Sequence, residues 1–360
     1  MITISLCMIV KNEEEVLWNC LNSVKNIADE IIIVDTGSTD RSKEIASEFT
    51  DKIYDFEWVG DFAPARNYSF SHATMDYILW LDADDVLFEE DQKKLLELKK
   101  TLDPSVDSVS MIYNYGFDKY GNVTLSFRRN RLVKRSKNFK WYGDCHVYLQ
   151  VNGKILDTDI CVSHKRKHHS TGRNLAIYEN RISRGDKFSA RDYYYYANEL
   201  DENGFTEKAI ENYTIFLDMK EGWVEDKIAA CGRLADCYAK LGEIENQKQA
   251  LFKSFEYDEP RPEISCKIGY LLRSKQKYKA AAFWYELAVN YKRPKDNWGF
   301  FNEAYTTWVP HLNLCVCYYY LEDYEKANHH NEIARKYRPE DESVINNKKL
   351  LDAKLSNRVE

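Results

Sequence analysis

Apolar residues follow two different patterns along this chain, and the change between them lies near residue 188. Over residues 2–115, short continuous apolar runs alternate with stretches in which apolar residues recur every three or four positions. The runs are typical of strands buried on both faces of a parallel sheet, and the other stretches are typical of amphipathic helices. We therefore predict an α/β domain with a Rossmann-like, mostly parallel sheet and right-handed crossovers.

Four strands and three helices are predicted in this region. The strands cover residues 2–10, 30–34, 53–56 and 77–81, and the helices carry the apolar sets Leu17, Leu21, Val24 and Ala28, then Ile45, Ala46 and Phe49, then residues 63–73. Ser38 and Thr39 have the side chains that cap helices, and we expect them to cap the second one. Ligands of such sheets bind at the carboxyl ends of the strands, so the loops that follow the strands are the place to search.

From residue 188 onward the strand-like runs disappear and a short motif recurs. Gly204-Phe205-x-x-Lys208-Ala209-Ile210 resembles the turn between the two helices of a tetratricopeptide repeat, and variants of it occur near residues 242, 277 and 323. The equivalent positions Ala209, Gln247, Ala281 and Ala327 are 38, 34 and 46 residues apart, which brackets a repeat of roughly 34 residues. We predict two domains, residues 1–187 and an all-α, tetratricopeptide-like helical-repeat domain over residues 188–360.

Composition and charge argue against several classes of protein. A chain with 44% hydrophobic and 30% charged residues is globular, and its net charge of −7 disfavours nucleic acid as a partner. Nine cysteines without a C-x-x-C pair favour reduced thiols in a cytoplasmic protein. The chain has no apolar run of about 18 residues and no charged segment ahead of its first strand, so we expect neither a transmembrane segment nor a signal peptide.

Acidic residues directly follow two of the predicted strands. Asp35 ends the run EIIIV and can accept hydrogen bonds from a base or a ribose, while Gly37 permits a tight turn into the next helix. Asp82-Ala83-Asp84-Asp85 follows the run YILWL, where one carboxylate can hold ribose hydroxyls and another can ligate a divalent cation on a diphosphate. The alternatives are an ordinary helix N-terminus at Asp35 and a solvated acidic loop at Asp82.

Arg66 is the third candidate in this region. It lies in the segment DFAPARN, residues 61–67, which opens the predicted helix before YILWL. A guanidinium there can order the carboxylates of Asp35 and Asp82 or contact a nucleotide. The alternative is a surface salt bridge.

Four segments together resemble family-2 glycosyltransferases, and more narrowly the bacterial branch with C-terminal tetratricopeptide repeats that glycosylates peptides and proteins. They are CMIVKNEE at 7–14, VDTGSTD at 34–40, FAPARN at 62–67 and LDADD at 81–85, in the order and spacing of the family. The resemblance implies a nucleoside-diphosphate sugar, usually a UDP-sugar, and an inverting single displacement. It implies nucleotide-sugar contacts at Val10, Glu13, Asp35, Arg66, Asp82 and Ala83, and Mn²⁺ or Mg²⁺ on Asp84. Thr36 departs from the pattern, since many members carry a second Asp there.

The acceptor side is expected within residues 128–170. Trp141-Tyr142-Gly143-Asp144-Cys145-His146-Val147 resembles the W-x-G-x-V-H-E segment of the same branch, but Val147 replaces the Glu. Asp144 and His146 remain as candidates for the general base that an inverting transfer needs, or they simply organise the loop. His164 resembles a late histidine of the family and is a candidate metal ligand, with a structural role as the alternative.

Two basic stretches flank this region. Arg128, Arg129 and Arg131 with Lys134 and Arg135 form the first, and residues 165–169 (KRKHH) form the second. Such cations suit mobile loops that close over a diphosphate leaving group, and solvated loops are the alternative.

The leading hypothesis is a metal-dependent glycosyltransferase, of the hexosyltransferase kind, acting on a peptide, protein or glycan acceptor. A peptide-binding repeat scaffold with a degenerate transferase domain is the alternative, and the intact Asp82-Ala83-Asp84 argues against it. A sugar nucleotidyltransferase would need a glycine-rich basic loop after the first strand, where this chain has Lys11-Asn12-Glu13-Glu14. A homo-oligomer formed through the repeats is a further expectation.

Overall fold

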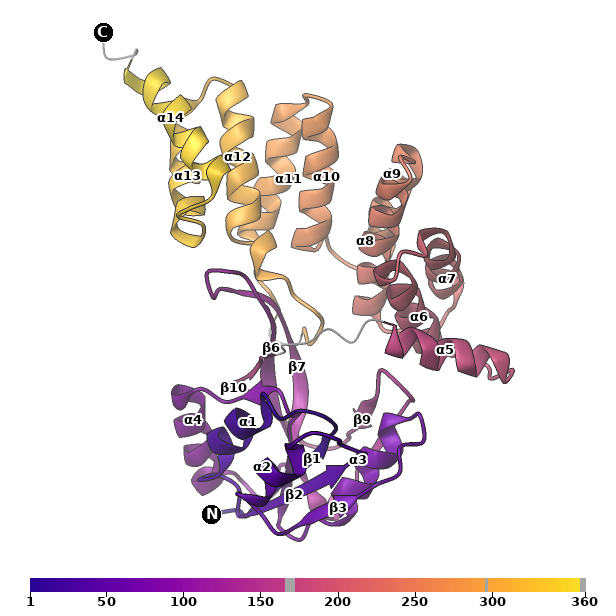
Figure 1. Cartoon of the computed structure of the whole chain (residues 1–360). Helices are drawn as coiled ribbons and strands as arrows, with labels where there is room; N and C mark the ends of the chain where they lie inside the picture. The colour runs from indigo at the N-terminus through magenta and orange to yellow at the C-terminus, as the bar shows by residue number, and fades with distance from the viewer. Residues whose placement is uncertain (166–171, 295–296, 357–360) are drawn as a thin grey trace. The chain divides into compact units, whose positions relative to one another are not determined.

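A computed structural model describes residues 1–165, 172–294 and 297–356. The chain separates into two compact units (Figure 1). Residues 1–116 and 126–185 form the first, here called the sheet unit, and residues 117–125 and 186–360 form the second, here called the helical unit. The two units are described separately below. The sequence predicts a domain boundary after residue 187, and this boundary stays a prediction.

The sheet unit contains an eight-stranded sheet with the order β3-β2-β1-β4-β7-β6-β10-β5. Its strands are β1 (Ile4–Val10), β2 (Glu30–Asp35), β3 (Ile53–Asp55), β4 (Tyr77–Trp80), β5 (Asp85–Val86), β6 (Ser108–Phe117), β7 (Val123–Lys134) and β10 (Ile155–His164). The pairs β1–β2, β1–β4, β2–β3 and β6–β10 are parallel, whereas β4–β7 and β5–β10 are antiparallel. The predicted mostly parallel sheet is therefore confirmed. A separate antiparallel pair joins β8 (Lys140–Tyr142) to β9 (Tyr148–Gln150).

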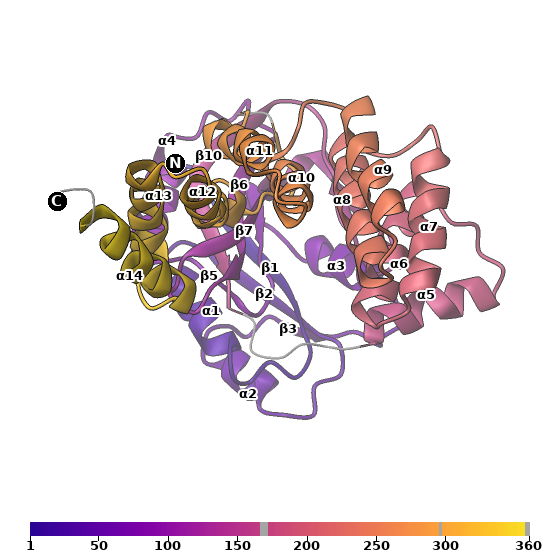
Figure 2. The same cartoon turned by 90° about the horizontal axis from the view of Figure 1, so that it is seen from above.

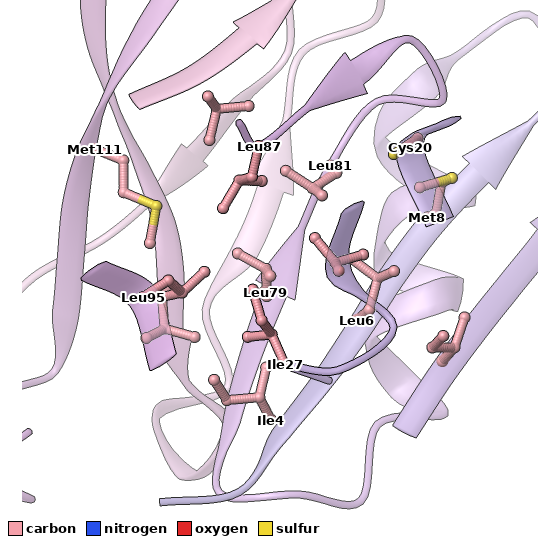
Figure 3. Packing of buried hydrophobic residues seen from close by; sticks show 14 of the residues in the cluster. Ile4, Leu6, Met8, Cys20, Ile27, Leu79, Leu81, Leu87, Leu95 and Met111 are labelled. Carbon is pink, nitrogen blue, oxygen red and sulfur yellow. The ribbon is translucent and has the colours of Figure 1, made fainter. Parts of the chain in front are cut away.

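Helices cover both faces of the sheet, which explains the continuous apolar runs. They are α1 (Leu17–Val24), α2 (Ser42–Ser47), α3 (Phe62–Ser71) and α4 (Glu89–Thr101). A fifth helix of the sheet unit, α5 (Arg173–Ser183), comes after the last strand in the chain. Alternate residues of one strand enter different cores: Leu6 and Met8 of β1 pack with α1 and α4, while Cys7 packs with residues of α3. Figure 3 shows the first of these cores, in which Leu6 and Met8 of β1, Leu79 of β4 and Leu95 of α4 are labelled. Almost every position of β1 and β2 is buried, which favours apolar residues on both faces of these strands.

The expected cap of α2 is wrong. The helix begins at Ser42, and neither Ser38 nor Thr39 caps it. The Ser38 hydroxyl instead accepts a hydrogen bond from the Asn12 backbone N–H (3.0 Å), and the Thr39 N–H donates to Asn12 Oδ1 (2.7 Å). These bonds tie the loop after β2 to the loop after β1, which keeps residues 36–41 out of the helix.

The helical unit consists of helix pairs, and the predicted all-helical class is confirmed. Its helices are α6 (Ala190–Glu202), α7 (Thr206–Asp218), α8 (Val224–Lys240), α9 (Ile244–Lys253), α10 (Pro262–Ser274), α11 (Tyr278–Asn290), α12 (Trp308–Tyr320), α13 (Tyr324–Tyr337) and α14 (Glu342–Ser356). Partners within a pair lie side by side in Figures 1 and 2. The residues that the spacing singled out as small contacts, Ala209, Ala281 and Ala327, are fully buried, whereas Gln247 is half-buried.

The turns inside the four pairs share one backbone geometry. The second turn residue has a positive φ in each: Gly204 (84°), Gly242 (75°), Gln276 (56°) and Glu322 (62°). The next N–H then donates to the carbonyl five residues earlier, as from Phe205 to Leu200 and from Lys277 to Leu272. This bond is the Schellman ending of a helix, which favours glycine at the positive-φ position. The recurring motif in the sequence is therefore a recurring helix ending.

Candidate active site

Asp35 lies at the carboxyl end of β2 and is almost completely buried. Its Oδ2 accepts hydrogen bonds from the backbone N–H groups of Gly37 and Ser38, both at 3.0 Å. Gly37 has φ +100°, which an L side chain rarely adopts, so the turn requires glycine. Asp35 Oδ1 is buried and has no hydrogen-bond partner in the described part of the chain. A ligand that supplies a donor to this oxygen would satisfy it.

Asp82 follows β4 and pairs with Arg66 of α3. The two atoms Arg66 Nη2 and Asp82 Oδ1 are 2.5 Å apart, and the guanidinium lies over the rings of Trp80 (5.2 Å) and Trp141 (4.7 Å). Although burial by itself raises the pKa of Asp82, the positive charges of Arg66 and the arginines of β7 lower this pKa well below its ordinary value. Asp82 is therefore ionised. Arg66 contacts Asp82, but no bond from it to Asp35 occurs among the described residues, and its role at a nucleotide stays a prediction.

Asp84 and His164 come together although 80 positions separate them in the sequence. Antiparallel pairing of β5 with β10 sets His164 opposite Asp85, and the His164 Nδ1 atom lies 3.2 Å from Asp84 Oδ1. Burial lowers the pKa of His164, but the carboxylates of Asp84 and Asp85 outweigh it and raise the pKa to about 9. The imidazole is therefore protonated at neutral pH and forms an ion pair with these acids.

This group is able to hold a divalent cation. One ligand atom each from Asp84, Asp85 and His164 lies within 4.8 Å of the others. Carboxylate oxygens suit Mg²⁺ and Mn²⁺, and an imidazole suits Mn²⁺ as well. Asp85 is less able than Asp84 and His164 to ligate a cation, because its Oδ2 already accepts hydrogen bonds from Arg131 and from the Asp82 backbone N–H, both at 2.9 Å. The donor set thus fits a cation held chiefly by Asp84 and His164, and their role as metal ligands stays a prediction.

Three residues of this site were not foreseen as parts of it. Asp85 and Arg131 form a fully buried ion pair, and the Tyr113 hydroxyl lies 2.7 Å from Asp85 Oδ1 and 2.9 Å from His164 Nδ1. Burial raises the pKa of the Tyr113 hydroxyl, which keeps it protonated and able to donate. The third acid of the Asp82-Ala83-Asp84-Asp85 run was a visible signal for Asp85. Tyr113 and Arg131 have no such signal, because they lie on other strands.

The expectation of basic loops is wrong for the first stretch. Arg128, Arg129 and Arg131 lie on β7, and the Arg129 guanidinium is within 5.6 Å of the ring centres of Trp80 and Tyr113. Contacts inside the sheet unit hold two of these side chains. Arg131 neutralises the buried Asp85, and Arg128 donates a hydrogen bond to the Thr158 carbonyl. Within the second stretch, residues 166–169 lie outside the described residues.

The other residues predicted for the nucleotide lie around the same strand ends. Val10, buried, ends β1, and its carbonyl accepts the Thr36 N–H (2.9 Å) and hydroxyl (3.1 Å). Ala83 is buried between Asp82 and Asp84. Burial, and then the negative charges of Asp84 and Asp82, raise the pKa of Glu13 to about 7. Glu13 therefore lies close enough to this acidic pair for their charges to oppose its ionisation.

Asp144 and His146 contact α5. Asp144 Oδ2 lies 2.7 Å from Arg181 Nε, and the His146 ring stacks on Tyr178 with centroids 6.2 Å apart. The structure thus gathers the nucleotide and metal candidates at one sheet edge and leaves the two candidate bases on a neighbouring loop, where their role stays a prediction.

Comparisons with known proteins agree with this geometry. Residues 5–158 match the family model of glycosyl transferase family 2. A TPR repeat-containing protein of Synechococcus elongatus is 28% identical over 275 residues, which are 76% of this chain and 61% of that protein. The SPbeta prophage-derived glycosyltransferase SunS of Bacillus subtilis is 29% identical over 235 residues, which are 61% of this chain and 56% of SunS. The chain thus spans about three fifths of the length of these relatives.

A solved structure of S. aureus TarS 1-349 in complex with UDP-GlcNAc is similar over 72% of this chain and 93% of that one, at 15% identity and a TM-score of 0.38. Among the described residues, no helix is both long and apolar enough to cross a membrane. The family match covers the strands, the acidic loops and Arg66, while a TPR repeat-containing relative extends over much of the chain. Residues 5–158 of this chain therefore resemble glycosyl transferase family 2, and the helical unit that follows resembles tetratricopeptide repeats.

Proposed function

We propose that this chain is a metal-dependent, inverting glycosyltransferase that moves a sugar, a hexose in the simplest case, from a UDP-sugar to a peptide, protein or glycan. The observation that carries the proposal is the convergence of Asp84 and His164 beside the ionised Asp82, two strands away from the unsatisfied Asp35 oxygen. Anionic oxygens and an imidazole at one sheet edge suit a nucleotide whose diphosphate is bridged by a cation.

Each residue then has a defined task. Asp35 and Asp82 accept hydrogen bonds from the nucleoside, and Arg66 keeps Asp82 ionised and oriented. Asp84 and His164 would hold Mn²⁺ or Mg²⁺, which when bound supplies positive charge to the diphosphate as it leaves. Tyr113 and Asp85 orient His164 through the hydrogen bonds described above.

The transfer itself is a single displacement. The acceptor oxygen, sulfur or nitrogen attacks the anomeric carbon from the face opposite the diphosphate, so that one bond forms while the bond to the diphosphate breaks. A base, Asp144 or His146, takes the proton of the acceptor, and UDP departs with the bonding electrons. Inversion at the anomeric carbon follows from the one-step attack.

The helical unit is the proposed acceptor side. Stacked helix pairs provide extended surfaces that suit a peptide or protein chain. The alternative, a peptide-binding scaffold with an inactive transferase domain, requires the cation and nucleotide residues to be disrupted. Among the described residues, Asp84, Asp85 and His164 lie together and Arg66 pairs with Asp82, which supports an enzyme.

The test is nucleotide release from UDP-sugars with and without Mn²⁺ for Asp84→Asn. This change keeps the shape of the side chain but removes the charge, and we expect release to fall by at least about 100-fold. Asp51→Asn is the matched control, because Asp51 is an exposed acid in the loop before β3. Turnover of Asp84→Asn equal to that of the control would remove Asp84 from the site. No release by the unaltered protein with any UDP-sugar would favour the scaffold.

A further inference from the structure

An open pocket lies beside Asp84 that none of the nucleotide residues lines. It is formed by α1, by the segment from Asp84 to Phe88, by the start of α4 and by Lys165, and its volume is about 380 Å³. α1 and α4 pack on the same core beneath it. Pockets that bind small molecules begin at about 300 Å³, so this one suits a single sugar ring rather than a whole nucleotide sugar.

Three of the polar residues that line the pocket, Asn19, Asn22 and Gln92, have side-chain amides. Asn19 and Asn22 of α1 make no side-chain hydrogen bond with any residue that the structure describes. Gln92 of α4 uses its amide nitrogen to donate to the Leu87 carbonyl (2.8 Å), and its carbonyl oxygen accepts no bond within the described part. An amide offers donors and an acceptor without net charge, which matches hydroxyl groups because these also both donate and accept.

The rest of the lining adds apolar side chains and the three charged residues Asp84, Glu89 and Lys165. Phe88 is 48% exposed, a large fraction for a phenyl ring, and Lys165 Nζ lies 5.1 Å from its centre. Val16 and Leu87 provide further apolar surface. An exposed aromatic ring next to uncharged amides suits a ring with apolar C–H faces and a rim of hydroxyls. A phosphate would need several cations, whereas the lining of this pocket contains one, Lys165, together with the two acids Asp84 and Glu89.

The position of the pocket connects it to the transfer site. Asp84 lines the pocket and also pairs with His164, and the Lys165 N–H donates to the Asp84 carbonyl (2.7 Å). We propose that the pocket binds a neutral sugar ring, which is either the sugar that the donor carries or a sugar of the acceptor. This inference rests on the proposed function, because that function brings sugars to Asp84.

The test replaces Asn22 by Leu, which keeps the size of the side chain and removes its hydrogen bonds. Asn26→Leu is the matched control, since Asn26 is exposed just beyond the end of α1 and does not line the pocket. One arm measures the affinities of UDP, UDP-glucose, UDP-galactose and UDP-N-acetylglucosamine by calorimetry. The other arm measures binding of the three free sugars by saturation-transfer NMR. The loss of one or two hydrogen bonds should weaken sugar binding about 3- to 10-fold.

The two arms separate the sources. If Asn22→Leu binds UDP-sugars more weakly but UDP with unchanged affinity, the pocket binds the donor sugar. If it binds free sugars more weakly but UDP-sugars with unchanged affinity, the pocket binds an acceptor sugar. Equal affinities of Asn22→Leu and Asn26→Leu in both arms would overturn the proposal, and so would an unaltered protein that binds UDP-sugars no more tightly than UDP and binds no free sugar. If no UDP compound binds but free sugars do so through Asn22, the proposed function fails and the pocket stands.

Discussion

Replacing His164 by Gln should change the number of protons that this protein releases when it binds Mn²⁺. In the cation-free protein the pKa of His164 is raised to about 9 by its two carboxylate neighbours, after the opposing effect of burial. An imidazole must be neutral to ligate a metal ion, so the bound cation and the proton compete for His164. Binding of Mn²⁺ should therefore depend on pH well above the ordinary pKa of histidine.

The magnitude follows from the two raised pKa values in the site. With a pKa of about 9, about 99% of His164 is protonated at pH 7, so it contributes about one proton per Mn²⁺. Glu13, with a pKa of about 7, is about half protonated, and a cation near Asp84 favours its ionised form, which adds up to about half a proton. The apparent affinity should rise about tenfold per pH unit between pH 6 and 8.

The measurement is calorimetric titration of Mn²⁺ at pH 7 in buffers of different ionisation enthalpy, which counts the released protons. The unaltered protein and the Asp51→Asn control should release between about 1 and 1.5 protons, and His164→Gln should release only about half a proton. A second readout is stability without cation: a raised histidine pKa stabilises the fold fully below about pH 6.5, and this contribution is lost as the pH rises through about 9. The difference in Tm between the unaltered protein and His164→Gln should therefore shrink over that window.

Equal proton release by His164→Gln and the unaltered protein would refute the reasoning, because His164 would then neither carry the proton nor ligate the cation. Release of half a proton or less by the unaltered protein would also contradict the raised pKa. If the unaltered protein does not bind Mn²⁺, the proposed metal site does not exist. His164→Gln lacks one ligand and should bind Mn²⁺ more weakly, so its titration uses a higher Mn²⁺ concentration.

Three further predictions address the buried ion pair, the helix endings and the base. Arg131→Met leaves the Asp85 carboxylate buried and unpaired and should lower the free energy of unfolding by about 3–5 kcal/mol in urea titrations, whereas a loss below about 1 kcal/mol would show that the pair is not needed. Gln276→Gly removes an L side chain from φ +56° and should stabilise the protein by about 1 kcal/mol, so a lower Tm would count against the helix-ending geometry. Of Asp144→Asn and His146→Gln, the variant that removes the base should slow acceptor transfer by about 10²- to 10⁴-fold without weakening UDP-sugar binding, and two active variants would place the base elsewhere.

Much of the architecture could be predicted from the sequence because it depends on near neighbours. Residues 31–34 of the run EIIIV are all apolar because both faces of β2 are covered, and a strand buried in this way has a recognisable composition. Asp35 and Asp82 stand directly after such runs, so their place at the sheet edge followed from the strands alone. The repeat spacing was visible for the same reason, since each helix ending is formed within about six residues.

The tertiary structure decided everything that depends on which strands become neighbours. No periodicity shows that β5 pairs with β10, and this pairing is what sets His164 beside Asp84. The same holds for Arg131, which looked like part of a basic loop and is instead a buried strand residue, because the charge that it neutralises comes from a distant segment. A charged side chain has no fixed environment in a sequence, since water, an ion pair or a ligand can each satisfy it, and only the contacts made on folding select one of them.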